Sequence, residues 1–216
     1  MRLVTANLFN DRADAGAVEE LIGAVRPDVF CAQELGPSAA EVLKAGFRSG
    51  LINPRDDCHV HALVAGTDLR VERLDLPGRP GLIAMVSNAG TETMVMSIHL
   101  SNPIEGKKAL DERRRQVDGV LARIDGVERV VIVGDLNATT LWTSYRRLRS
   151  VLEDGVLDWS RRASQRALPT WGPFPNGRAF LRIDHVMTRG VRVDSVSVRR
   201  IAGSDHRVLV VDLEPT

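Results

Sequence analysis

Four short apolar runs in the chain end in a polar residue. Asn7, Glu34, His99 and Asp135 each follow residues with the length and composition of a β-strand, such as 130–134 before Asp135. Amide, carboxylate and imidazole groups are side chains that bind hard cations or phosphate. One such residue carries little information, but four of them indicate strand ends that converge on a common rim, where loops carry function. The pattern predicts a fold built on β-sheets with a polar site at the carboxyl ends of strands.

Strand-like and helical segments alternate irregularly along the chain, which is typical of a mixed α/β fold. Apolar spacing predicts helices at 14–25, 38–45 and 107–124. The predicted strands are 2–8, 29–33, 60–64, 82–86, 93–100, 130–134, 183–187, 191–198 and 208–213. Two of them, 82–86 and 93–100, are joined by a turn around Asn88-Ala89-Gly90, which indicates a hairpin. A purely parallel sheet is therefore disfavoured.

Length and composition indicate an ordinary globular protein, expected to form one domain over residues 1–216. Hydrophobic residues make up 44% of the chain and charged residues 26%, which excludes a disordered polypeptide. No apolar run approaches the roughly 20 residues of a transmembrane helix and no signal-type segment follows Met1, so we expect a soluble, cytoplasmic protein. The net charge of +1 lacks the overall basic character of many nucleic-acid-binding proteins. Two cysteines are too few for a disulfide framework, and Cys31 is expected to be a small buried residue.

The sharpest local motif is Gly134-Asp135-Leu136-Asn137. Gly134 allows a tight turn, and the two-residue spacing directs Asp135 and Asn137 to the same side if the strand geometry persists. The alternative is a turn in which Asp135 bonds the backbone and caps the next helix. The motif alone favours that alternative.

A second motif is Gly203-Ser204-Asp205-His206, which is preceded along the chain by Asp184. A carboxylate that accepts a hydrogen bond from a histidine fixes its tautomer and favours its protonated form, as a group facing a phosphate anion requires. A serine-hydrolase triad is disfavoured, because adjacent residues rarely present their side chains to one another and no Gly-x-Ser-x-Gly motif is present.

Taken together, the ordered motifs resemble the endonuclease/exonuclease/phosphatase family, which includes DNase I, AP endonucleases, neutral sphingomyelinases and inositol-phosphate phosphatases. The motifs are Thr5-Ala6-Asn7, Gln33-Glu34, His99-Leu100, Gly134-Asp135-Leu136-Asn137, Ile183-Asp184-His185 and Ser204-Asp205-His206. Arg113 and Gln116 also look like that family's Arg-x-x-Gln helix, a structural element. The closest motif similarity, around Thr170-Trp171 and Arg182-Ile183-Asp184, is to VanJ-like bacterial members, which carry transmembrane helices and act on lipid phosphates at membranes.

The resemblance implies a DNase I-like four-layer α/β/β/α sandwich, in which two mixed β-sheets pack face to face with helices outside. It also implies a divalent-metal-dependent hydrolase of phosphoric ester bonds. The metal would be held by Glu34, Asn7 and Asp205; Mg²⁺ is the default ion and Mn²⁺ a plausible substitute. No obligate protein partner is indicated.

The same resemblance implies a division of labour among five catalytic residues: His99, Asp135, Asn137, Asp184 and His206. Asp135 would orient or deprotonate the attacking water, although His206 remains an alternative base. Asn137 would hold the phosphate, His99 and His206 would donate to its non-bridging oxygens, and Asp184 would orient His206. Such groups position an in-line water and stabilise a more highly charged transition state.

The resemblance implies a phosphodiester or phosphomonoester substrate, with a nuclease-type substrate favoured. Phospholipids, polyprenyl phosphates and small phosphorylated metabolites are the alternatives, and a non-catalytic binding module that retains the fold is an alternative of another class. An AP endonuclease is disfavoured, because Tyr145, the sole tyrosine, follows the Asp135 motif in a helix.

One stretch, from Ser160 to Ile183, is strongly basic and interleaved with aromatic residues. Trp171, Arg178 and Arg182 within it are candidate substrate-binding residues that would line the cleft. Equally, the aromatic residues would pin a long loop to the core while the arginines are solvated. His59 and His61 have a two-residue spacing but no third ligand nearby, so we expect them on a strand surface.

Overall fold

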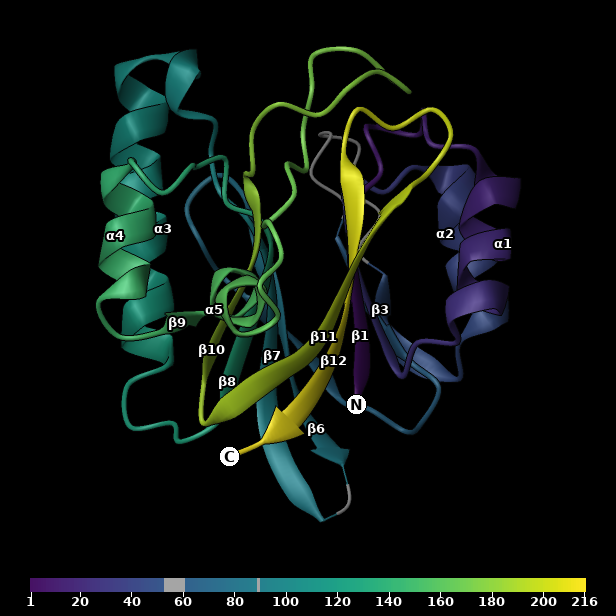
Figure 1. Cartoon of the computed structure of the whole chain (residues 1–216), viewed down its shortest axis with the longest axis horizontal. Helices are drawn as coiled ribbons and strands as arrows, with labels where there is room; N and C mark the ends of the chain where they lie inside the picture. Colours follow the sequence, from purple (N-terminus) through teal and green to yellow (C-terminus); the bar gives the residue numbers. More distant parts are fainter. Residues whose placement is uncertain (53–60, 89) are drawn as a thin grey trace.

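The computed structural model describes residues 1–52, 61–88 and 90–216, and its strands form two six-stranded sheets (Figure 1). The first sheet has, in spatial order, β11 (Val191–Arg200), β12 (Arg207–Pro215), β1 (Arg2–Asn7), β2 (Val29–Gln33), β4 (Ala62–Ala65) and β3 (Ser49–Ile52). The second has β5 (Val71–Leu74), β6 (Gly81–Asn88), β7 (Thr91–His99), β8 (Val130–Asp135), β10 (Asp184–Arg189) and β9 (Glu153–Asp154). In each sheet one pair is parallel, β1 with β2 and β7 with β8, and the other pairs are antiparallel. Both sheets are therefore mixed.

Helices cover the two outer faces, as Figure 1 shows at its right and left edges. The helices α1 (Ala15–Val25) and α2 (Pro37–Gly46) pack on the first sheet, and α3 (Lys107–Arg123) and α4 (Thr143–Arg149) pack on the second. A short η1 turn (Pro103–Glu105) precedes α3, and α5 (Gly155–Arg162) packs against β10 and β11. The predicted four-layer sandwich is confirmed.

The alternation of side chains along each strand builds three separate cores. In β8, Val131 and Val133 face the other sheet, whereas Val130 and Ile132 face α3 and α4. All four side chains are fully buried. A strand buried on both faces reads as a continuous apolar run, which is why the sequence identified it. Each such side chain contributes about 1.5–3 kcal/mol through burial.

The strands that escaped prediction are short or irregular. β3 contains Gly50, β5 is an edge strand with partly exposed side chains, and β9 is an edge strand of two residues. The predicted hairpin is confirmed, since β6 and β7 pair antiparallel. Residues 53–60 and 89 lie outside the described residues. They include the first residue of the predicted strand 60–64 and Ala89 of the predicted turn. Within the described chain, no helix is long and apolar enough to span a membrane.

The register of the strands brings their polar ends together. Asn7 pairs with Gln33 at the ends of β1 and β2, and His99 pairs with Asp135 at the ends of β7 and β8. Asp184 begins the antiparallel strand β10 and lies opposite Asp135. The polar residues at these strand ends therefore share one rim, to which both sheets contribute.

Candidate active site

Asn7 and Glu34 form the part of the site that belongs to the first sheet. Glu34 follows β2 with φ of 49°, a left-handed conformation that turns its side chain out of the strand direction. The Asn7 amide nitrogen lies 3.2 Å from Glu34 Oε1 and 3.2 Å from Asp135 Oδ2, and donates to both. Its amide oxygen accepts from the Phe9 backbone N–H at 3.0 Å. Asn7 therefore connects two carboxylates from different sheets, and its predicted role as a metal ligand stays a prediction.

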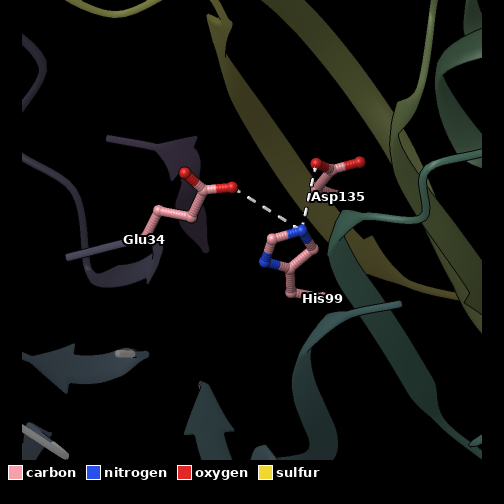
Figure 2. Close-up of side chains that lie close together, drawn as sticks. All are labelled: Glu34, His99 and Asp135. Atoms are coloured by element: carbon pink, nitrogen blue, oxygen red, sulfur yellow. Dashed lines mark ion pairs between the residues drawn. The ribbon is translucent and has the colours of Figure 1, made fainter. Parts of the chain in front are cut away.

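His99 lies between the two carboxylates, as Figure 2 shows. Its Nε2 atom is 3.8 Å from Glu34 Oε1 and 3.4 Å from Asp135 Oδ2. One ligand atom from each of these three residues lies within 4.8 Å of the others, which is compact enough to hold a cation. A second such group consists of Asp135, Asp184 and His206. Asp135 belongs to both groups and is the centre of the site.

Arg79 is a site residue that the sequence did not reveal. Its Nη1 atom lies 2.5 Å from His99 Nε2, and its side chain is buried against the cleft. An arginine nitrogen can only donate a hydrogen bond, so His99 Nε2 accepts it and is not a donor in this arrangement. Glu105 Oε1 lies 3.7 Å from the other terminal nitrogen of Arg79. Arg79 thus brings a permanent positive charge to the site, beside the histidine for which a donor role was predicted.

The Asp135 motif forms the aspartate turn of the alternative prediction, but it caps no helix, because the next helix, α4, begins only at Thr143. Asp135 Oδ1 accepts from the Asn137 backbone N–H at 2.7 Å, as in an aspartate turn, and Asn137 has φ of 47°. The Asn137 amide nitrogen donates to the Leu100 carbonyl at 2.9 Å, and the side chain still lines the cleft. Gly134 has φ of 128°, and a Cβ there would lie 2.0 Å from the Ile98 carbonyl oxygen. Glycine is therefore required where β8 approaches β7.

His206 and Asp184 form a pair that joins the two sheets. His206 Nδ1 lies 2.9 Å from Asp184 Oδ2, and its Nε2 atom lies 3.8 Å from Asp135 Oδ2. Burial opposes protonation of His206, but the carboxylates of Asp184, Asp135 and Asp205 outweigh it and raise the pKa of the imidazole to about 10. Burial also raises the pKa of Asp135, and only part of that shift is offset by the nearby His206. The imidazole is therefore a cation at neutral pH, and Asp135 is a stronger base than an exposed aspartate.

Asp205 is held at the edge of the same cluster. Its Oδ2 atom accepts from the Trp171 indole N–H at 3.0 Å, and its Oδ1 atom lies 4.0 Å from His206 Nε2. The neighbouring Ser204 hydroxyl donates to the Asn7 carbonyl and accepts from the His206 backbone N–H. Ser204 is thus bonded to the backbone and does not form a nucleophile pair with the histidine.

A cleft of about 400 Å³ opens over these groups. Trp171 lines it, together with Trp142, Leu181 and Ile104. Neither Arg178 nor Arg182 is among the described residues that line the cleft.

Arg182 instead lies behind the cleft, where two of its nitrogens donate to Asp154 at 2.6 and 3.2 Å. Asp154 is fully buried, and burial alone would raise its pKa, but its contacts with His185 and Arg182 outweigh this and lower it well below the usual range. The same carboxylate accepts from the Tyr145 hydroxyl at 2.7 Å, and His185 Nε2 lies 2.7 Å from the Ala138 carbonyl. A buried carboxylate needs an opposite charge, which explains why Arg182 turns inward.

The remaining histidine prediction needs correction. His61 is fully buried, and its ring packs edge-on against that of His99 with centroids 5.9 Å apart, so it does not lie on a strand surface. His59 lies outside the described residues. Cys31 is buried, as predicted.

The geometry agrees with a comparison against protein families. The model of the Endonuclease/Exonuclease/phosphatase family matches residues 4–206. The chain belongs to this family. The resemblance read from the six motifs is therefore confirmed, and with it the general class of the enzyme, a hydrolase of phosphoric ester bonds. Comparison with curated protein sequences gives no match.

Solved structures with the same fold cover almost the whole chain. The 3'-5' exonuclease from Neisseria meningitidis is 16% identical with a TM-score of 0.79, covering 99% of this chain and 100% of that one. The humanized TDP2 of D. rerio is 20% identical with a TM-score of 0.77, covering 99% and 98%. A mannosyl-6-phosphatase from Bacteroides thetaiotaomicron is 18% identical with a TM-score of 0.71, covering 99% of both chains. At these identities the likeness shows the DNase I-like fold and leaves the substrate open.

Proposed function

We propose that this protein is a divalent-metal-dependent phosphoesterase that hydrolyses its substrate by in-line attack of a water molecule. The observation that carries the proposal is the convergence of Glu34, His99, Asp135 and His206 from two sheets onto one cleft. Glu34 can supply a ligand oxygen to a cation, Asp135 can accept a proton, and His206 carries a proton for the phosphate. This combination suits a reaction in which negative charge increases at phosphorus.

The chemistry of the donor set fits a hard cation. Glu34 supplies a carboxylate oxygen close to that of Asp135, and burial raises the pKa of Glu34, although Asn7, His206 and Arg79 offset part of this shift. Asp205 Oδ1 is buried and accepts no hydrogen bond from the described part of the chain. Oxygen donors of this kind suit Mg²⁺, with Mn²⁺ as a substitute. A bound cation would neutralise the phosphate and stabilise the developing charge.

Asp135 is the base in this proposal. The pKa of His206 is raised, so its imidazole is protonated at neutral pH and is unsuited to accept the proton of water. The raised pKa of Asp135 makes this carboxylate a better proton acceptor near neutrality. Water loses its proton to Asp135 as its oxygen forms a bond to phosphorus, and the ester P–O bond breaks on the opposite side, releasing an alkoxide that takes a proton from solvent.

The other residues position and stabilise the phosphate. His206 donates from Nε2 to a non-bridging oxygen, and Asp184 fixes its orientation through Nδ1. Asn137 lies beside His99 and can donate from its amide nitrogen. Arg79 adds a fixed positive charge in the position next to His99. Each preorganised donor is expected to contribute on the order of 10²-fold in rate.

Nuclease activity is one candidate among the phosphoesterase activities. Trp142 and Trp171 line the cleft and offer flat surfaces on which bases can stack. Against it, Arg79 is the sole arginine, and no lysine is found, among the described residues lining the cleft. Proteins that follow a nucleic-acid backbone use rows of such cations.

A substrate panel tests the proposal. Plasmid DNA, bis-p-nitrophenyl phosphate, p-nitrophenyl phosphate and lysophospholipids are each incubated with Mg²⁺ or with EDTA. We expect hydrolysis with Mg²⁺, loss of it in EDTA, and a fall of about 10² or more in Glu34→Ala. Glu41→Ala, which removes an exposed carboxylate from α2, is the matched control. Activity that persists in EDTA or in Glu34→Ala would refute the metal-dependent mechanism.

A further inference from the structure

Exposed apolar side chains gather on loops beside the cleft. We define the rim loops as residues 101–106, 136–142 and 163–183, which follow β7, β8 and α5. Within them, Ile104 is 83% exposed, Leu141 82%, Phe174 71% and Phe180 64%. In Figure 1 the loop 163–183, drawn in green, rises beyond the strands at the upper end of the molecule, where η1 also lies. The apolar surface is therefore concentrated at the end that carries the active site.

These side chains are not explained by packing. A phenylalanine that pins a loop to the core becomes buried, and Phe174 and Phe180 are not. The apolar surface continues into the cleft itself, because Ile104, Trp142 and Leu181 line it while remaining partly exposed. Single exposed apolar residues need no explanation, but an exposed group around a binding cleft marks an interaction surface.

The charges beside this surface show which partner fits it. Arg166 and Arg178 are exposed on the loop 163–183, and Lys107 and Lys108 are exposed directly after the first rim loop, where Lys108 lies 3.8 Å from Glu112 and Asp111 is also exposed. The acidic residue of the rim loops that remains exposed is Glu105. Aromatic and aliphatic side chains flanked by arginine and lysine are typical of segments that enter the interfacial region of an anionic bilayer.

We propose that the rim loops dock on an anionic lipid bilayer, with the cleft facing the membrane surface. The substrate would then be a phosphate ester carried by a membrane amphiphile, whose phosphate reaches His206 and Arg79 while its apolar part contacts Ile104, Trp142 and Leu181. This inference rests on the proposed phosphoesterase function for its substrate, but the docking surface stands on the loops alone.

Vesicle sedimentation tests the docking surface. Phe174→Ser combined with Phe180→Ser removes apolar groups that do not line the cleft. Met85→Ser and Val151→Ser are the matched controls, because each residue is 44% exposed and lies outside the rim loops. We expect the native protein and both controls to bind vesicles of phosphatidylcholine with phosphatidylglycerol, and the double variant to bind at least about tenfold more weakly. Equal binding by the double variant, or no binding by the native protein, overturns the proposal.

Two substrates separate this inference from the proposed function. Bis-p-nitrophenyl phosphate is soluble, so its hydrolysis with Mg²⁺ is expected to be unchanged in the double variant. Hydrolysis of a lysophosphatidic acid embedded in the same vesicles is expected to fall at least about tenfold. If the soluble ester is cleaved, but the native protein and the double variant cleave the vesicle substrate equally, the docking proposal is refuted and the proposed phosphoesterase function is retained.

The converse results are also distinct. If neither ester is cleaved, the proposed function fails, and sedimentation alone decides the docking surface. If the double variant loses affinity for single-stranded DNA while the native protein ignores vesicles, the surface belongs to nucleic acid and the membrane proposal is overturned.

Discussion

Arg113 offers the most direct test of how the fold supports the site. Its side chain is 3% exposed and extends from α3 beneath the loops that follow β7 and β8. It donates to the Ser101 carbonyl at 2.8 Å, the Leu136 carbonyl at 2.5 Å and the Ser144 hydroxyl at 2.7 and 2.9 Å. Those carbonyls come shortly after His99 and Asp135. Removing Arg113 therefore affects stability and catalytic geometry together.

The size of the effect follows from these contacts. A hydrogen bond to a charged group contributes about 1.5–3 kcal/mol, and a buried acceptor left without a donor costs about 1–3 kcal/mol. Part of this is offset, because burying the guanidinium is itself unfavourable and lowers the pKa of Arg113 to about 10. We expect Arg113→Ala to lower the free energy of unfolding by about 3–5 kcal/mol, because three buried acceptors lose their donor at once. This is a large share of the roughly 5–15 kcal/mol of a typical domain.

Urea unfolding followed by circular dichroism measures the loss. Arg114→Ala is the matched control, because Arg114 is the next residue on the same helix and is exposed. It should change the free energy of unfolding by no more than about 0.5 kcal/mol. If the two variants unfold at the same urea concentration with equal slopes, Arg113 does not support the site as inferred.

Three further predictions follow from the polar contacts. The pKa of His206 is raised from its ordinary value of 6.5 to about 10, so its stabilising charge is fully present below pH 6.5 and lost as the pH rises towards 10. Asp184→Asn lowers that pKa, so the alkaline limb of the pH–rate profile should move to lower pH; an unchanged limb would contradict the pairing. Asp154→Asn breaks an ion pair whose carboxylate is fully buried and should lower the free energy of unfolding, measured in urea, by about 3–5 kcal/mol. Trp171→Phe removes the donor to Asp205 and should weaken Mn²⁺ binding about 10-fold to 100-fold by calorimetry, without loss of the fold seen by circular dichroism.

The strand ends were predictable because their signal is local. Glu34, His99 and Asp135 each lie at the end of a regular apolar strand. Neighbouring parallel strands bring such ends to the same edge of a sheet, and this does not depend on the conformation of the connecting segments. The helices α1, α2 and α3 were predictable for the same reason, since each has a continuous apolar stripe.

Long-range contacts account for what the sequence could not reveal. Arg79 lies in an irregular segment between Pro77 and Gly81, where no periodicity marks it, and only the fold places it against His99. Arg182 looked like a residue of the cleft, because the sequence does not disclose that Asp154 is buried beside it. The sequence around an arginine in a basic loop does not show which carboxylate the arginine will contact in the folded protein.

The site exists only when the two sheets are packed together, since neither sheet alone holds all the polar side chains that line the cleft. Asn7 reaches Asp135 across the gap, and Asp184 reaches His206 in the opposite direction. Below these contacts, Gln33 is fully buried and its amide donates to Ser97 on the facing strand at 3.1 Å. A buried polar bond between sheets fixes their register, because sliding one sheet would leave its groups unsatisfied. Since misplacement by about 1 Å can reduce a rate 10²-fold, the packing between the sheets acts on catalysis as directly as the residues at the rim.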